Sequence, residues 1–228
     1  MEGMGAITAN LTVDGLEIPD DIIHTLDGFR AWAATLGEDG PRIHFYDGQV
    51  HIEMTPQSYK THLPIISAIN RRLGALAEKL DIGRYFEQGG WLTNEEAQLS
   101  TEPDGMLLLW ETFTSGAARI QPNEIELCGR VDMVLEVVSK TSVAKDTVRL
   151  REGYARAGIP EFWLVDARDD RLKLKILTLR ADRRYRESRP DAKGWRRSPV
   201  WRGSFKVSRS KDRLGLPRVE LGYRPARA

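Results

Sequence analysis

The sequence predicts an α/β protein with a mixed β-sheet core flanked by helices. Three neighbouring segments carry this prediction. Residues 131–138 follow the two-residue period of a strand but are largely apolar on both faces, which indicates a strand inside a covered sheet. Residues 143–157 have apolar side chains at helical spacing, and Gly158 followed by Pro160 predicts the end of that helix. Residues 161–166 then form a second apolar strand, which a right-handed crossover would place parallel to the first.

Size and composition indicate a globular chain with one main domain. The 228 residues are 41% hydrophobic and 29% charged, and a chain of this length can bury a large core. The single cysteine, Cys128, excludes an internal disulfide and a zinc site built from several cysteines. No apolar run approaches the length of a membrane helix, and the N-terminus lacks the layout of a signal peptide. We therefore expect a cytoplasmic protein with no membrane partner.

The net charge of +1 hides a marked asymmetry along the chain. Residues 180–228 contain 16 Lys and Arg against 5 Asp and Glu, whereas the preceding 179 residues contain 18 against 28. A basic tail on an acidic body indicates either a nucleic-acid contact or a tail that folds onto the body. Aromatic residues such as Trp195, Trp201 and Phe205 argue against simple disorder. They could contact DNA, but the simpler interpretation is a small core with short strands.

Upstream of the central unit, the pattern predicts a helix, a hairpin and a second helix. Residues 21–36 have apolar side chains near helical spacing. Asp47-Gly48 lies between the alternating runs of residues 42–54, which is a strong hairpin signal. Residues 64–80 follow as a helix that begins with a proline, and its apolar stripe should pack on the sheet.

The segments on either side of the central unit predict further strands. Residues 84–92 fit one strand loosened by two glycines, and residues 106–110 fit a buried strand. Residues 111–129 fit a polar loop. Residues 171–177 alternate apolar and basic side chains, which predicts a half-exposed strand at the sheet edge.

The candidate site is formed by two acids, Asp104 and Glu136, and not by Asp132. Asp132 and Glu136 lie four residues apart, or about 13 Å along a strand, so they cannot share one ion and Asp132 is expected to be structural. An acid such as Glu136 inside an apolar strand needs a compensating partner. Asp104, which lies just before the predicted strand at 106–110, is the best candidate for a partner of Glu136 on a neighbouring strand. A bound Mg²⁺ or Mn²⁺ would relieve their repulsion and would suit phosphodiester hydrolysis.

The same residues also have structural interpretations. Asp104 could be a turn former beside a glycine. Glu136 could form a buried ion pair with Arg149 or Arg151. His62, near a predicted helix N-terminus, could contact phosphate or could be a structural histidine.

Several of these motifs resemble the Uma2 family, which belongs to the PD-(D/E)XK restriction-endonuclease-like proteins. The matching stretches are Met54-Thr55-Pro56 with His62, Pro103-Asp104, the run VLEVVS at 134–139, and YARAGIPEFWLVD at 154–166. The resemblance covers roughly residues 42–178. It implies a restriction-endonuclease-like α/β core and a metal-dependent DNA endonuclease, with Asp104 and Glu136 at the two acidic positions of the active site.

The sequence departs from the family pattern at its basic residue. The lysine that normally follows the second acid by two residues is replaced by Val138, and a lysine often found on the next helix is replaced by Leu150. Lys140, Lys145, Arg149 or Arg151 could instead reach the site. An arginine holds its proton too tightly to act as a base, but it can orient a phosphate.

The full expectation has three segments: an N-terminal, partly helical extension at 1–41, an endonuclease core at 42–178, and a basic C-terminal segment at 179–228 packed as short strands. Asp104 and Glu136 are the expected catalytic and metal-binding residues, with Mg²⁺ or Mn²⁺ as cofactor. The expected substrate-binding residues are His62, Lys140, Arg149 and Arg151. DNA is the expected partner, and a homodimer is an option because cutting both strands often uses two copies. The alternatives are an inactive nucleic-acid-binding or regulatory protein of the same fold, and a structural protein whose acids form internal ion pairs.

Overall fold

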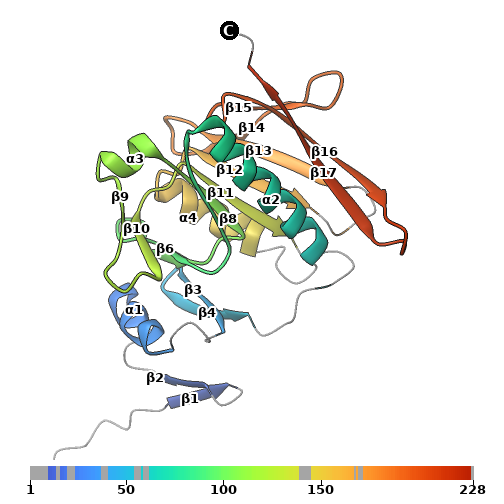
Figure 1. Cartoon of the computed structure of the whole chain (residues 1–228). Helices are drawn as coiled ribbons and strands as arrows, with labels where there is room; N and C mark the ends of the chain where they lie inside the picture. Colours follow the sequence, from blue (N-terminus) through green and yellow to red (C-terminus); the bar gives the residue numbers. More distant parts are fainter. Residues whose placement is uncertain are drawn as a thin grey trace, which may run out of the picture.

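The structure is a computed structural model that describes residues 10–13, 16–19, 24–36, 41–53, 58, 62–138, 145–166, 168 and 172–226. These residues form an α/β fold in which two six-stranded sheets and a three-stranded sheet are flanked by a few helices (Figure 1). A hairpin of β1 (Asn10–Val13) and β2 (Leu16–Pro19) lies at the N-terminal end. None of the described helices is long and apolar enough to cross a lipid bilayer.

The main sheet has the strand order β14-β13-β12-β11-β8-β5 and is mixed, as the sequence predicts. Its two central strands are parallel, and the strand beside β11 on the other side is antiparallel to it. The strands are β5 (Gly83–Glu87), β8 (Gly105–Leu109), β11 (Met133–Val138), β12 (Glu161–Asp166), β13 (Lys173–Leu179) and β14 (Tyr185–Glu187).

Helices cover both faces of the main sheet (Figure 1). On one face lies α2 (Leu63–Leu80), whose isoleucines and leucines pack on the odd-numbered side chains of β11. On the other face lies α4 (Leu150–Arg156), preceded by a π-helical turn (Lys145–Arg149), which packs on the even-numbered side chains. Because Glu136 is even-numbered, its carboxylate points toward α4 and not toward α2.

A second sheet, in the order β4-β3-β7-β6-β10-β9, packs on the α4 side through a shared apolar core. Its strands are β3 (Arg42–Tyr46), β4 (Gln49–Glu53), β6 (Trp91–Asn94), β7 (Leu99–Thr101), β9 (Ala118–Ile120) and β10 (Glu126–Gly129). Helix α1 (Leu26–Thr35) is capped by the Thr25 hydroxyl and packs Phe29 on Phe45 of this sheet. The predicted hairpin is present, with Asp47 and Gly48 both at positive φ.

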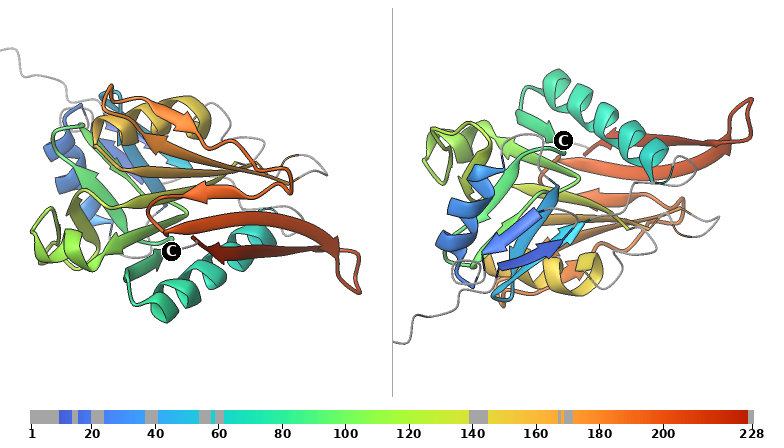
Figure 2. Two further views of the ribbon diagram at one scale, coloured as in Figure 1. Left: turned by 90° about the horizontal axis from the view of Figure 1, so that it is seen from above. Right: turned by 90° about the horizontal axis from the view of Figure 1, so that it is seen from below.

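The chain ends in a three-stranded sheet made of β15 (Arg196–Ser198), β16 (Gly203–Lys211) and β17 (Pro217–Pro225). Phe205 and Leu221 of this sheet join the core between α2 and the main sheet. Figure 2 shows that the pair β16–β17 runs beside α2 and ends beyond the strands of the main sheet. The C-terminal segment therefore contains two nine-residue strands, which are longer than the short strands that the sequence predicts.

Three sequence predictions about strands are wrong in detail. Residues 84–92 form not one strand but β5 and β6, which belong to different sheets and are separated at Gly89, whose φ of 116° lets the chain change direction. The predicted loop at 111–129 contains a short helix, α3 (Trp110–Thr114), and the strands β9 and β10. Elements of three to five residues are too short for a periodic pattern to reveal. Finally, β13 is not an edge strand, because the three-residue strand β14 pairs with its last three residues.

One acid of the main sheet, Glu161, attaches the C-terminal segment to the core. Its side chain is fully buried and accepts hydrogen bonds from Trp163 Nε1 at 2.5 Å, Ser198 Oγ at 2.6 Å and the amide of Val200 at 3.3 Å. Burial raises the pKa of this carboxyl to about 7, although the three donors favour the ionised form. The proton is therefore bound more tightly in the folded chain than in the unfolded chain.

This shift predicts how stability depends on pH. A raised pKa in the folded state contributes stability that is fully present below about pH 4.5 and is lost as the pH rises through about 7. The stability lost across this pH range is roughly 3 kcal/mol in total. In Glu161→Gln, which cannot ionise, the free energy of unfolding measured with urea at about pH 5 and about pH 8 should lose this pH dependence. Glu87→Gln, at an exposed acid of β5, is the control. An unchanged pH dependence in Glu161→Gln would contradict the assignment.

Candidate active site

Asp104 and Glu136 come from adjacent strands of the main sheet. β8 and β11 are antiparallel, with Gly105 opposite Leu135, so the next step along this register places Asp104 opposite Glu136. The amide of Val137 donates to Asp104 Oδ2 at 2.7 Å, which fixes the aspartate side chain at the end of β11. Both acids are buried, with 3% and 2% of their surface exposed. The structure thus brings together the two acids that the sequence predicts to meet.

A tyrosine of α4 binds the second acid. The hydroxyl of Tyr154 donates to Glu136 Oε1 at 2.5 Å, and both side chains are buried. The helical pattern places Tyr154 on the apolar face of its helix, and its ring does pack there against Phe162. The hydrogen bond adds a second role, because it orients the Glu136 carboxylate from the face opposite α2.

The cation beside the acids is Arg42, at the start of β3 in the second sheet. Its Nη2 lies 2.8 Å from the carbonyl of Glu102 and 3.4 Å from Asp104 Oδ1, and its guanidinium also contacts the carboxylates of Glu102 and Glu53 at 3.2 and 3.4 Å. Burial alone would lower the pKa of Arg42, but the charges of Asp104, Glu102, Glu53 and Glu136 raise it above its usual value. Arg42 is therefore a fixed positive charge among four acids.

The sequence analysis did not identify Arg42 as a site residue. Arg42 is the first residue of the hairpin, in a different sheet and about 60 residues before Asp104. The contact depends on how the two sheets pack, which no local pattern reveals. The one available signal was the position of an arginine at the first residue of a strong hairpin motif. Glu53, the last residue of the same hairpin, was missed for the same reason: its position near the acids depends on how the two sheets pack.

His62 lies directly before α2 and contacts Asp104 and the backbone at the end of β11. Its Nε2 is 2.8 Å from the carbonyl oxygen of Val137 and 3.8 Å from Asp104 Oδ2. Because a carbonyl oxygen only accepts, Nε2 must carry the hydrogen. Among the described residues, the buried Nδ1 of His62 has no hydrogen-bond partner. The histidine therefore bridges the end of β11 and the aspartate, and it still has one ring nitrogen to offer.

The backbone of Asp104 is held by a separate pair of side chains. Asn70 Nδ2 of α2 donates to the carbonyl of Asp104 at 2.8 Å, and the hydroxyl of Tyr85 donates to Asn70 Oδ1 at 2.8 Å. A Cβ atom at Gly105 would collide with the Tyr85 hydroxyl and with Asn70. The glycine after the aspartate is therefore a packing requirement of this network as well as a turn signal.

The other predicted residues lie elsewhere or outside the described residues. Lys140 is not among the described residues, and Arg149 is exposed on the π-helical turn. Arg151 is exposed and donates to the carbonyl of Tyr185 on β14, three strands away from β11. The expected roles of these residues toward a substrate stay predictions. Asp132 accepts hydrogen bonds from the amide of Leu109 and the hydroxyl of Thr112, which agrees with a structural role at the start of α3.

The donor set fits a hard divalent cation better than zinc. Within the described part of the chain, no group of three or more His, Cys, Asp or Glu side chains is arranged to hold a metal ion. A closed zinc site needs four such ligands, whereas Mg²⁺ is commonly bound by one or two carboxylates and keeps several waters. A carboxylate offers about four lone-pair positions, so the donors on Asp104 and Glu136 do not by themselves exclude coordination.

Arg42 should be essential for the stability of the acid cluster. Arg42→Met removes the cation among four carboxylates, and the free energy of unfolding should fall by on the order of 3 kcal/mol near neutral pH. Burial raises the pKa of Glu102, and the positive charge of Arg42 opposes part of that rise. Without Arg42 the pKa of Glu102 should therefore be higher still. An acid with a raised pKa stabilises the fold at low pH, so the loss should shrink near pH 4. Urea unfolding measures this effect. An equal loss in Arg84→Met, at an exposed arginine of β5, would contradict it.

Comparison with known proteins identifies a family and related solved structures. The model of the Uma2 family, described as "Putative restriction endonuclease", matches residues 26–204. A crystal structure described as a "putative nuclease belonging to DUF820 from Anabaena variabilis ATCC 29413" has a TM-score of 0.53 and 22% sequence identity, over 78% of this chain and 90% of that chain. At this identity the likeness shows the fold alone. No curated protein matches the sequence. The family model spans most of the chain, and the protein belongs to the Uma2 family.

Proposed function

We propose that this protein is a metal-dependent endonuclease that hydrolyses phosphodiester bonds in DNA. The observation that carries the proposal is the pair Asp104 and Glu136. Glu136 lies in β11, Asp104 directly precedes the adjacent strand β8, and both are near the guanidinium of Arg42. Membership of a family described as "Putative restriction endonuclease" supports the same function, as does the related fold of a protein described as a "putative nuclease".

In this mechanism Asp104 and Glu136 would hold Mg²⁺ or Mn²⁺. When bound, the ion would lower the pKa of an attacking water and offset the charge that develops on the phosphate. Val137 N–H and Arg42 keep the Asp104 carboxylate in place, and the Tyr154 hydroxyl does the same for Glu136. These bonds preorganise the acids, so little reorganisation is needed when substrate arrives.

The family lysine has no direct replacement in the described structure. Val138 and Leu150 occupy its two expected positions, and both are buried among apolar side chains. Arg42 is the described cation closest to its role, but a guanidinium cannot accept a proton at neutral pH. Arg42 can therefore stabilise negative charge but cannot act as the general base. The apolar Leu150 at one of the family lysine's positions favours the alternative function, a binding or regulatory protein of the same fold that does not cleave.

Cleavage assays separate these two functions. Supercoiled and linear DNA should be cut in the presence of Mg²⁺ or Mn²⁺ and left intact with a chelator. Asp104→Asn and Glu136→Gln should each lower the rate at least about a hundredfold, because each removes a charged metal ligand. Glu87→Gln, the same chemical change at an exposed acid of β5, should cut at the wild-type rate. Cutting that persists in both site variants would point to a contaminating nuclease, and no cutting by the wild type would favour the binding protein.

Metal binding can be tested without cleavage. A ligand present at 100 times its dissociation constant stabilises the folded state by about 2.7 kcal/mol, so the melting temperature should rise with Mn²⁺. The rise should vanish in Glu136→Gln and persist in Glu87→Gln. An equal rise in all three proteins would place the bound metal elsewhere.

A further inference from the structure

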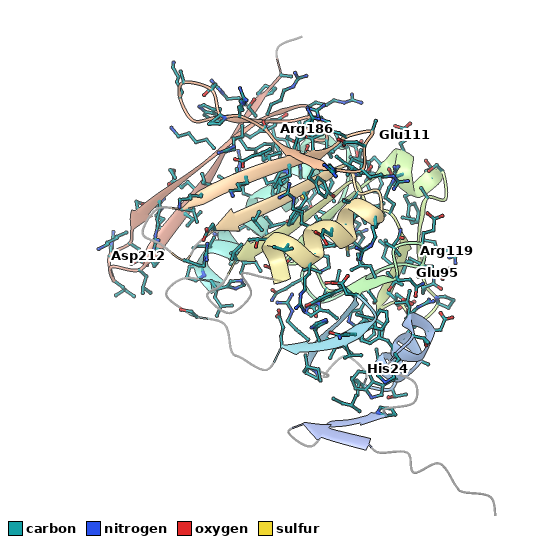
Figure 3. All side chains as sticks on the ribbon, turned by 180° about the vertical axis from the view of Figure 1, so that it is seen from behind. His24, Glu95, Glu111, Arg119, Arg186 and Asp212 are labelled. Atoms are coloured by element: carbon teal, nitrogen blue, oxygen red, sulfur yellow. The ribbon has the colours of Figure 1, made fainter. Side chains whose placement is uncertain are left out.

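The C-terminal ribbon formed by β16 and β17 is a long arm with an anchored base. The two strands pair residue for residue over nine positions, a length of about 30 Å. Phe205 and Leu221 bury the base in the core beside α2. At the tip, Asp212 accepts hydrogen bonds from the amides of Leu214 and Leu216, which fixes the turn. Figure 3 shows Asp212 at the far end of the arm, away from the sheets.

The arm is strongly basic. Between residues 203 and 226 it carries six cations and two acids: Lys206, Arg209, Lys211, Arg213, Arg218 and Arg224 against Asp212 and Glu220. Asp212 is engaged in the tip turn, and Glu220 lies 3.5 Å from Arg218. Six cations against two acids leave the arm with a net charge of +4 and therefore with a positive potential.

The arm and α2 enclose a groove of about 800 Å³. Four cations line it, Arg71 and Arg72 from α2 and Lys206 and Arg218 from the ribbon, against the single acid Glu220. The groove is held in shape by a direct bond, in which Arg72 Nε donates to the carbonyl of Leu221 at 3.3 Å. Positive charge thus converges from two elements that are far apart in the sequence.

The buried side-chain contacts of the arm with the body are apolar. They are those of Phe205, Val219 and Leu221 with the leucines and isoleucines of α2 and with the main sheet. Arg224 of the arm pairs with Asp191 of the same C-terminal segment at 2.8 Å. Lys206 and Arg218 of the arm line the groove.

We infer that the ribbon and the adjoining face of α2 form a surface that binds the backbone of duplex DNA. A rigid row of cations fits a polyanion with regularly spaced charges, and a two-stranded ribbon fits against a DNA groove. Because it names the surface that holds the substrate, this inference rests on the proposed function. The family match ends at residue 204, so the arm lies almost entirely beyond it.

The position of the groove relative to the acid pair suits one bound duplex. Helix α2 begins beside Asp104, where His62 lies 3.8 Å from that carboxylate. Arg71 is nine residues further along, or about 13 Å along the helix axis. That is less than half of one helical turn of DNA, about 34 Å, so a duplex in the groove is long enough to reach the end of α2 that lies beside Asp104. Figure 2 shows that the ribbon tip lies past this same end of α2.

The test is the affinity of the full-length protein for a fluorescent duplex of about 20 base pairs, measured by anisotropy in chelator so that nothing is cut. The groove variant is Arg71→Gln, Lys206→Gln and Arg218→Gln combined. The control variant, with the same loss of three charges, combines Arg119→Gln, Arg130→Gln and Arg180→Gln at exposed arginines outside this groove.

The groove variant should bind at least about tenfold more weakly, with a salt dependence shallower by roughly two to three ions. The control should change less than about threefold. Circular dichroism and thermal melting establish that both variants fold.

Three outcomes would overturn the inference. They are wild-type affinity in the groove variant, an equal loss in both variants, and tighter binding of RNA or of an acidic peptide than of duplex DNA. Failure of the proposed function is distinguished by the cleavage assay with Glu136→Gln, because binding in chelator does not depend on the acid pair. A groove variant that loses affinity while the wild type fails to cut would support the surface and reject the nuclease.

Discussion

Removing a carboxylate from water costs several kcal/mol unless donors or cations replace the lost hydration, and this constraint shapes the whole core. Glu126 of the second sheet is compensated by a two-point contact with Arg30 of α1. Asp132 is compensated by the start of α3, and Glu161 by donors that include Ser198 of the C-terminal segment. Each of these buried acids joins an outer element to a sheet. The compensating bonds thus also explain how the peripheral elements are attached.

The pair Asp104 and Glu136 differs from the other buried acids in the number of carboxylates gathered around one cation. Arg42 faces both acids and also Glu53 and Glu102. Asp104 and Glu136 each have a further donor, the amide of Val137 and the hydroxyl of Tyr154. The bonds that compensate these two acids therefore come from both sheets and from α4.

Much of the fold follows from sequence periodicity, but the contacts between distant segments do not. The parallel pair β11–β12, the hairpin and helix α2 have strong patterns. Asp104 could be matched to Glu136 because Glu136 lies inside one apolar strand and Asp104 directly precedes another. The location of Arg42 depends on sheet packing. The ribbon was underestimated because serines and basic residues interrupt its apolar positions, which weakens the alternating signal. In both cases tertiary packing, not local preference, decides the outcome.

The crowding at Gly105 has a consequence for how this protein can evolve. No other residue type fits beneath Tyr85 and Asn70 without displacing them, and Asn70 holds the backbone of the preceding aspartate. A change at this position would therefore disturb Asp104 even though its side chain remained intact. Asp104 and Gly105 are therefore constrained together, and descendants of this protein that keep the aspartate should also keep the glycine.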